Sequence, residues 1–514
     1  MPLSLPRRPL ARLIPLLLAF SVAGPAFAVD PPVDIEPSHR HDGPQELETI
    51  EVKGAILPTK ADEMSRPVEV LSGEALDETK ANSLGETVGK LPGVQSSYFG
   101  PGVGRPIVRG FDGARVQVLS DGLGSGDVST VSADHAVSIE PFLADQIEVL
   151  KGPATLLYGS GAIGGAVNVV DGRIPEAITD EPLEGRAELR AGTVNDERTG
   201  MVRVDGSTDN FALHADALHR ETGDVDTPFG TLAGTAIRTD SAALGGAYIG
   251  DRGFFGAGAS LFSTLYGIPG TQDEGGVRID MDQRRGELRA GIDDLGPFAS
   301  ARIKLAHTNY THVELEGPEI GTSFENDATE ARLELVHAPL AGWNGAFGLQ
   351  WGDRDFSAVG EEAFVPASRG RDAGLFWIGN RDFGSAWRLE LGARADRTEI
   401  DPVATAIGPD RTFDTASASA SLRWNASDDL HFDFGLDRAQ RAPIARKSIR
   451  WPRRSGRTAR SIPPARRPAC VGTHPTICIS TSAWIAHNAP RRRRSCIRTA
   501  HTSRRKASNA ACPR

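Results

Sequence analysis

The feature that most constrains the fold is a two-residue alternation of apolar and polar side chains, which runs from about residue 183 to residue 443. In residues 301–305, for example, alanine, isoleucine and leucine alternate with arginine and lysine. Segments of about ten such residues, separated by turns rich in Gly, Asp and Asn, are typical of outer-membrane β-barrel strands. The charged side chains would face a wet lumen and the apolar side chains would face lipid.

A soluble β-sandwich shows the same alternation and is the alternative fold. Two observations disfavour it. The alternating segments are long, and Trp387, Trp424 and Phe432 lie near the expected strand ends, as an aromatic girdle at the membrane interface requires. We therefore expect a mainly β protein built on a transmembrane β-barrel.

The N-terminus has the pattern of an export signal. Three arginines precede the apolar run at residues 13–22, and Ala26-Phe27-Ala28 supplies an A-x-A cleavage site. The apolar run is too short to cross a bilayer as a helix. We expect a signal peptide at residues 1–28, which excludes a cytoplasmic enzyme.

A flexible segment is expected at residues 29–59, because its first part is polar and rich in Pro and Asp. It contains one strip of alternating β-branched residues that suits strand addition to the sheet edge of a partner. The alternative is that the strip forms the first strand of the next domain. The strip consists of Glu48, Thr49, Ile50, Glu51 and Val52.

Residues 60–175 combine short strands with helical stretches and form an expected α+β domain. Four of its blocks resemble the plug domain of TonB-dependent outer-membrane receptors. The resemblance implies that the plug fills a 22-stranded barrel, and that residues 48–52 are a TonB box, on which the energy-coupling protein TonB pulls. The four blocks are residues 107–111 (IVRGF), 115–122 (RVQVLSDG), 146–153 (QIEVLKGP) and 157–170 (LYGSGAIGGAVNVV).

Three further stretches resemble the zinc-type branch of this family: residues 131–137 (VSADHAV), 266–270 (YGIPG) and 360–366 (GEEAFVP). The resemblance implies a metal site with Asp134 and His135 on a plug loop and Glu362 from the barrel. An imidazole with carboxylates suits Zn²⁺. Zinc is expected as the transported ligand, and no catalytic cofactor is expected.

The expected protein is therefore a monomer in the lipid of the outer membrane of a Gram-negative bacterium, where it takes up a scarce metal with TonB as its partner. A siderophore, haem or cobalamin is the alternative cargo, and a non-transporting adhesin is the alternative of another class. We find no nucleophile–base arrangement and no metalloprotease motif, so an enzyme is not expected. The pattern Gly159-Ser160-Gly161-Ala162-Ile163-Gly164 matches G-x-G-x-x-G, but a strand pattern follows it where a nucleotide site needs a helix.

The final part of the chain, residues 444–514, has another composition. It holds 18 of the 57 Lys and Arg, all four Cys and none of the 67 Asp and Glu. We expect a basic tail that is either translated out of frame or disordered, and no nucleic-acid partner. The alternating part before it, about 260 residues at about 20–25 per strand and connection, makes 10–12 strands. Because an open sheet leaves unpaired edges in lipid, we expect an incomplete barrel at residues 183–443 and a defective transporter.

Overall fold

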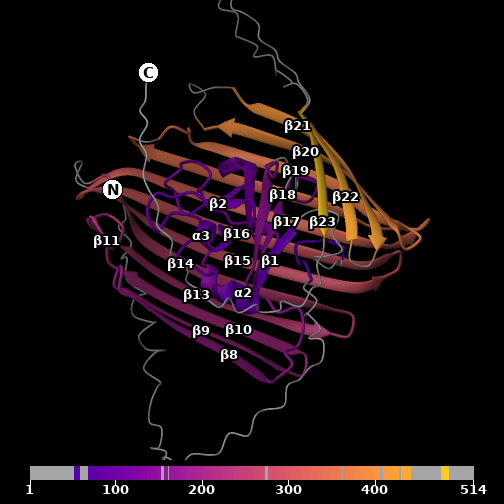
Figure 1. The fold of residues 1–514 in the computed structure, drawn as a ribbon, viewed down its shortest axis with the longest axis horizontal. Coiled ribbons are helices and arrows are strands. Elements are labelled where there is room, and N and C mark those ends of the chain that lie inside the picture. The colour runs from indigo at the N-terminus through magenta and orange to yellow at the C-terminus, as the bar shows by residue number, and fades with distance from the viewer. Residues whose placement is uncertain are drawn as a thin grey trace, which may run out of the picture.

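The structure is a computed structural model, and two parts of it are distinct: a small domain and a large curved sheet (Figure 1). Among the described residues, no helix combines the length and apolar character needed to span a membrane. The expected signal peptide, the first three residues of the strip at 48–52 and Glu362 lie outside the described residues. The structure describes residues 51–57, 68–151, 155–159, 161–271, 276–361, 363–403, 409–427, 430–441 and 476–485.

The small domain, called the plug below, is built on a five-stranded sheet with the order β1-β6-β7-β4-β5. Strands β4 and β7 are parallel and the other neighbours are antiparallel. Leu76 and Val88 from two short helices pack on Ile147, Val149 and Val167 of the sheet. Burial of each such side chain contributes about 1.5–3 kcal/mol. The plug elements are β1 (Val68–Ser72), α2 (Gly73–Asp77), α3 (Leu84–Val88), β2 (Val94–Ser96), β3 (Pro106–Val108), η3 (Gly113–Arg115), β4 (Val116–Ser120), β5 (Leu123–Gly124), η4 (Pro141–Leu143), β6 (Gln146–Lys151), α4 (Thr155–Tyr158) and β7 (Gly165–Val170).

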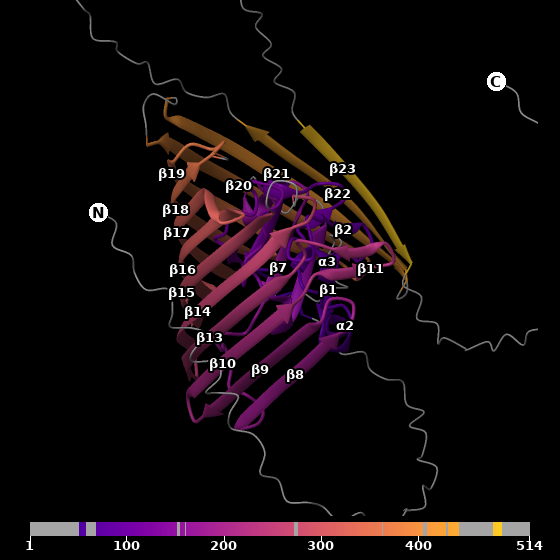
Figure 2. The same ribbon diagram turned by 90° about the vertical axis from the view of Figure 1, so that its left-hand side faces the viewer.

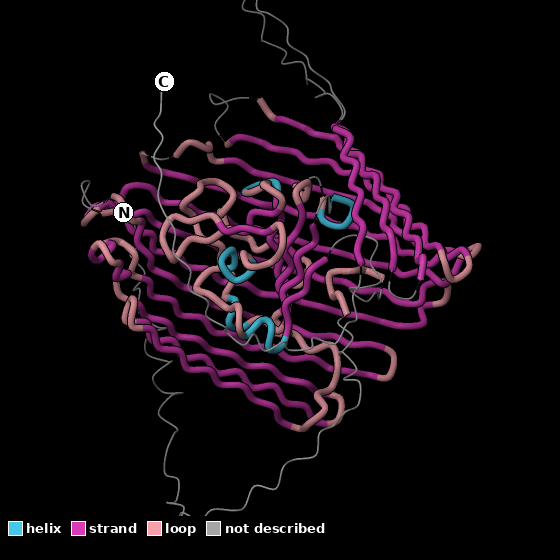
Figure 3. Tube along the Cα trace, in the orientation of Figure 1, coloured by secondary structure: helices cyan, strands magenta, loops and turns pink. Residues whose placement is uncertain are grey.

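The large sheet has 14 antiparallel strands among the described residues and curves around the plug (Figure 2). A short hairpin, β11 (Val225–Thr227) with β12 (Gly230–Leu232), lies between two of its strands in the chain. The helices, cyan in Figure 3, belong to the plug. The strands of the large sheet are β8 (Leu183–Gly192), β9 (Glu197–Thr208), β10 (Phe211–Thr222), β13 (Ile237–Gly250), β14 (Gly253–Ile268), β15 (Val277–Leu295), β16 (Phe298–Glu316), β17 (Glu319–Leu340), β18 (Trp343–Gly360), β19 (Ser368–Phe383), β20 (Trp387–Pro402), β21 (Arg411–Ser427), β22 (Leu430–Arg441) and β23 (Thr476–Ile485).

The expected mainly β fold with an N-terminal plug is confirmed, and the described part of the sheet is open, with β8 and β23 at its two edges. The expected count of 10–12 strands was too low, because 13 strands precede the tail. The first three, β8 to β10, have only 10 to 12 residues each and short connections. Strand β23 lies within residues 444–514 and pairs with β22; the rest of that tail lies outside the described residues.

The alternation orients the strands as the sequence predicts. On β16, Ile303 is exposed on the outer face, whereas Lys304 donates from Nζ to the carbonyl oxygen of Asp121 in the plug (3.0 Å). At the ends of three neighbouring strands, Trp387 stacks on Trp424 and Trp424 stacks on Phe432. These rings form the aromatic row that a membrane interface favours.

Buried arginines of the large sheet fix the plug in place. Arg220 donates from Nη1 and Nη2 to the two oxygens of Glu140, at 2.9 and 3.0 Å. Arg289 donates to Asp121 (2.8 Å), and Arg332 donates to the carbonyl oxygen of Leu157 (2.7 Å). Removing one partner of such a buried pair costs about 3–5 kcal/mol, because the other charge is left without compensation. The plug and the sheet are therefore one packed unit.

Candidate metal centre

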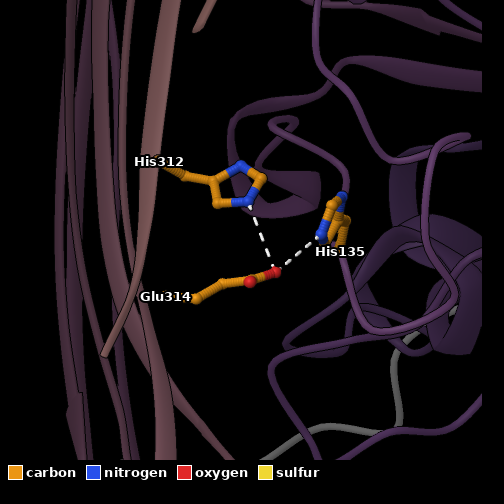
Figure 4. A group of neighbouring side chains, drawn as sticks. All are labelled: His135, His312 and Glu314. Carbon is orange, nitrogen blue, oxygen red and sulfur yellow. Dashed lines mark hydrogen bonds and ion pairs between the residues drawn. The ribbon is translucent and has the colours of Figure 1, made fainter. Parts of the chain in front are cut away.

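Three side chains with metal-binding atoms meet where the plug faces β16: His135 from a plug loop, and His312 and Glu314 from the strand (Figure 4). One such atom from each residue lies within 4.8 Å of the others. His135 Nε2 is 3.1 Å from Glu314 Oε1, and His312 Nε2 is 3.9 Å from the same oxygen. All three side chains are buried, His135 completely. Within the described residues, this is the one group of its kind.

The strand period places two of the three residues together. His312 and Glu314 are two positions apart on β16, so both point to the inner face. The register between β16 and β17 shifts between Val313 and Leu315, so Glu314 lies at a β-bulge. A bulge re-aims a side chain and is common beside functional sites. The local irregularity therefore contributes to the direction of the Glu314 carboxylate.

The hydrogen bonds of His135 determine what its second ring nitrogen can do. Nδ1 lies 3.2 Å from the carbonyl oxygen of Val128, which can only accept. Nδ1 therefore carries the proton. In the neutral ring, Nε2 then has a free lone pair that faces the Glu314 carboxylate, another acceptor. Two acceptors 3.1 Å apart need a cation between them, either a proton or a metal ion.

His312 is oriented in a comparable way. Its Nδ1 lies 2.9 Å from the hydroxyl oxygen of Tyr310, and its ring stacks on Phe324 at 4.4 Å. Its Nε2 is buried and has no hydrogen-bond partner among the described residues. When the tyrosine oxygen accepts from Nδ1–H, Nε2 offers its lone pair toward Glu314. A metal-binding histidine is usually oriented by a bond at its other nitrogen, as both rings are here.

The plug loop that carries His135 is fixed at several points. The hydroxyl of Tyr266 accepts from the backbone N–H of Ala136 (3.0 Å) and donates to the carbonyl oxygen of Asp134 (3.1 Å), one residue on each side of His135. Arg105 donates to the carbonyl oxygens of Ser129 (2.6 Å) and Ser132 (2.8 Å). These contacts hold the imidazole against β16 before any ligand arrives.

The donor set fits a divalent transition-metal ion. Zn²⁺ binds nitrogen and oxygen ligands at about 2.0–2.2 Å, so tetrahedral ligand atoms lie roughly 3.3–3.5 Å apart. The separations of 3.1 and 3.9 Å lie on either side of this value. Three protein ligands leave a fourth position for water, as in zinc sites that exchange a ligand. Imidazole also suits copper, iron and nickel, so the donor set defines a class of ions.

The residues that form the centre differ from the set expected from the sequence. His135 is in the centre. The neighbouring Asp134 directs its carboxylate to the hydroxyl of Ser132 instead, and Glu362 lies outside the described residues. Sequence reasoning missed His312 and Glu314. Their spacing, His-x-Glu on a strand pattern, is a signal that could have found them, because it places an imidazole and a carboxylate on one face.

A second buried polar cluster lies in the plug, where the chain after the strip at 48–52 meets β6. Glu148 accepts from the backbone N–H of Lys53 and of Gly54 (2.8 Å for Gly54), and Tyr158 donates to the carbonyl oxygen of Gly54 (2.8 Å). Gln146 donates from Nε2 to the carbonyl oxygen of Glu51 (2.9 Å). Burial raises the pKa of Glu148 above its usual range, and the hydrogen bonds it accepts, from Asn168 among others, oppose that rise.

Two family models match the chain. The TonB-dependent Receptor Plug Domain matches residues 60–166, and the TonB dependent receptor-like, beta-barrel model matches residues 189–461. The second match alone covers more than half of the chain.

Individual relatives and solved structures agree with these matches. The chain is 24% identical over 401 residues to the vitamin B12 transporter BtuB of Photobacterium profundum, covering 75% of this chain and 61% of that protein. It is 28% identical over 221 residues to the ferrioxamine B receptor of Salmonella typhimurium (42% and 30%). Among solved structures, the copper transporter OprC superposes with a TM-score of 0.63 at 16% identity (73% and 63%), and the FrpB iron transporter of Neisseria meningitidis with 0.61 at 13% (73% and 65%). The chain thus spans less than two thirds of each of these proteins.

Proposed function

The chain belongs to the TonB-dependent receptor family, and we propose that it acts as an outer-membrane transporter for a divalent metal ion, with zinc as the ion. Members of this family are receptors and transporters of the outer membrane of Gram-negative bacteria and are not enzymes. The expected zinc-type branch is part of this proposal.

One observation carries the choice of a metal ion. Three metal-binding atoms converge in a buried place at the boundary between plug and sheet. They are Nε2 of His135 with its lone pair, the unpartnered Nε2 of His312, and an oxygen of the Glu314 carboxylate. Such a group is costly to bury without a cation, because three electron-rich atoms face one another. A ligand bound there contacts both parts at once, so its arrival or departure can bias the position of the plug.

We also propose that Glu48, Thr49, Ile50, Glu51 and Val52 bind TonB, as the TonB box of the family does. The end of this strip supports the proposal, since Gln146 contacts the carbonyl of Glu51 and Glu148 holds the two residues that follow Val52. A pull on the strip would therefore act directly on β6 of the plug. Binding of a peptide with residues 48–52 to the periplasmic part of TonB tests this, and no binding would favour the adhesin.

An organic cargo is the second candidate, because the relatives include a vitamin B12 transporter and a ferrioxamine B receptor. Tyr98 and Phe99 of the plug are exposed, and Gly100 next to them lies against Pro269 after β14. Exposed aromatic rings are suited to the faces of a large organic chelate. This arrangement is the observation that supports a siderophore or cobalamin.

Zinc affinity of the purified chain in detergent separates the two candidates. It is measured by competition with a chromophoric chelator for the unchanged chain and for His135→Ala, His312→Ala and His307→Ala. His307 is the matched control, because it lies on β16 but is exposed and bonds to Thr329. We expect a zinc affinity at least 100-fold lower for the first two variants and an unchanged affinity for the third.

The same preparations are tested with cyanocobalamin and ferrioxamine B, followed by quenching of tryptophan fluorescence. Tight binding of either compound, together with zinc affinities that are equal in all variants, would replace the metal ion with the organic cargo.

A further inference from the structure

A polar cavity lies beside the metal centre and is separated from it by one short stretch of plug backbone. It has a volume of about 310 Å³, lies between plug segments and β17, β18, β19 and β20, and is partly open to solvent. Asp127 and Ser129 line this cavity. Val128 between them is buried in the apolar cluster around the metal centre, and its carbonyl oxygen accepts from His135. Residues 127–129 therefore form the partition between the centre and the cavity.

The sheet side of the cavity has a repeated pattern in which a glycine separates two side chains that carry oxygen. Each row runs across three neighbouring strands in register. The absence of a side chain leaves room that the neighbours use: the Asp372 carboxylate lies over Gly352, and Arg394 lies over Gly374, where it donates to both Gln350 and Asp396. A Cβ on Gly352 would lie 2.8 Å from Asp372 Oδ1, and one on Gly374 would lie 2.4 Å from Asp396 Oδ1. The two rows are Glu330–Gly352–Asp372 and Gln350–Gly374–Asp396.

Negative charge dominates the lining. Arg394 pairs with Asp396 (2.6 Å), and Asp353 pairs with Arg369 (2.7 Å), which does not line the cavity. The carboxylate of Asp372 has no hydrogen bond or ion pair with another side chain in the described part of the chain, while its backbone pairs with both neighbouring strands. Low-dielectric walls around uncompensated carboxylates concentrate cations. The charged residues of the lining are Asp127, Glu330, Asp353, Asp372 and Asp396 against Arg354 and Arg394.

A buried amide supplies an independent sign of a ligand. Asn326 lines the cavity, is 2% exposed and donates from Nδ2 to the carbonyl oxygen of Gly126 (2.9 Å). Its Oδ1 accepts no hydrogen bond from any described residue. An unsatisfied buried oxygen is costly, so it calls for a donor or a cation. Asn326 pairs across the sheet with Tyr310, which orients His312, so the residue lies in the sheet beside the strand that carries the metal centre.

We propose that the cavity is a second cation site, in which carboxylate and amide oxygens hold a hydrated divalent ion. Its place after the metal centre in a transport sequence rests on the proposed function, whereas the binding itself does not. Water occupies roughly 30 Å³ in the liquid, so 310 Å³ admits an ion with about six waters. Oxygen ligands alone hold a transition metal less tightly than a set with two imidazoles. An ion that leaves the centre thus finds a looser site on the other side of residues 127–129.

Manganese is the probe, because Mn²⁺ suits carboxylate and carbonyl oxygens. The electron paramagnetic resonance signal of free Mn²⁺ is titrated with the chain in detergent. The test variants are Glu330→Gln/Asp372→Asn and Gly352→Ala, whose added Cβ would displace the Asp372 carboxylate without changing charge. The control is Asp327→Asn/Asp355→Asn, a cross-strand pair on β17 and β18 that does not line the cavity. His312→Ala is added, and circular dichroism checks the fold of each variant.

We expect the more weakly bound Mn²⁺ of the unchanged chain to be kept in the control and to be the Mn²⁺ that remains in His312→Ala, and we expect its affinity to be at least tenfold lower in both test variants. Wild-type Mn²⁺ affinity in both test variants would overturn the inference. Loss of all Mn²⁺ binding in His312→Ala would also overturn it, because the bound ion would then have occupied the metal centre. If the test variants lose Mn²⁺ while the unchanged chain has no affinity for zinc, the proposed function fails and the second cation site remains.

Discussion

Two buried carboxylates of this molecule have opposite surroundings. Glu148 in β6 accepts hydrogen bonds from four donors, which are the backbone N–H groups of Lys53 and Gly54 and the side-chain amides of Gln146 and Asn168. Glu314 on β16 faces the ring nitrogens of two histidines, and no backbone N–H reaches it within the described residues.

The difference shows what each region is built to hold. A carboxylate with four donors is already satisfied, and what satisfies Glu148 is partly the chain's own segment after the strip at 48–52. At Glu314, the neighbouring His135 already donates a hydrogen bond from Nδ1 to the carbonyl oxygen of Val128. A positive charge, either a proton or a bound cation, satisfies the lone pairs that remain between the two rings and the carboxylate. We infer that the Glu148 cluster is made to hold and release a segment, and the Glu314 cluster to bind an external cation.

The largest effect is expected on zinc affinity, from a substitution at the metal centre that tests the different roles of the two carboxylates. Glu314→Ala removes the oxygen shared by both histidines, and we expect the zinc affinity to fall at least 100-fold, beyond the 10–100-fold cost of losing an outer partner of a ligand. Glu148→Ala should leave zinc affinity unchanged. Chelator competition measures both. Equal losses in the two variants would mean that the carboxylates act only through the stability of the plug.

A smaller effect is expected from Tyr310→Phe, which removes the hydroxyl beside His312 Nδ1 and keeps the ring. The imidazole then loses the bond that orients it, and zinc affinity should fall 10–100-fold. Tyr248→Phe serves as the control, because Tyr248 is exposed on β13. A zinc affinity that Tyr310→Phe does not change would show that packing on Phe324 alone orients His312.

The sequence predicted the large sheet because a period of two is a local property, which needs no knowledge of distant contacts. Ile303 and Lys304 illustrate this, since their faces follow from their positions alone. The metal centre is different. His135 was expected from its family resemblance, but His312 lies 177 positions further along the chain, and no local pattern shows that the plug loop reaches β16.

The next prediction concerns the docked segment, which is residues 53 and 54 where they lie against Glu148 and Tyr158. A Cβ on Gly54 would lie 2.6 Å from Glu148 Oε2 and 2.7 Å from the Tyr158 hydroxyl, so Gly54→Ala should displace residues 53 and 54. We expect the free energy of local opening to fall by about 1–3 kcal/mol, measured by hydrogen exchange at the amide of Lys53. Gly286→Ala is the control, because its Cβ would meet nothing within 4 Å.

The zinc affinity of Gly54→Ala is a second measurement for this prediction. If Glu148 holds the segment and Glu314 binds the cation, this affinity should stay unchanged. A loss of zinc with intact amide protection would reverse the roles assigned to the two carboxylates.

The smallest expected effect is the pH dependence of the docked segment. Burial raises the pKa of Glu148, whereas an exposed glutamate has a pKa of about 4.3. The docked state therefore binds more protons than the opened state between these two values, and its stability must fall as pH rises through that window. Each unit of the rise is worth about 1.4 kcal/mol. Hydrogen exchange at Lys53, corrected for intrinsic rates, should show this decline in the unchanged chain and in the exposed-site control Glu74→Gln, but not in Glu148→Gln. Opening that becomes harder as pH rises would show that the four donors, rather than burial, govern this carboxylate.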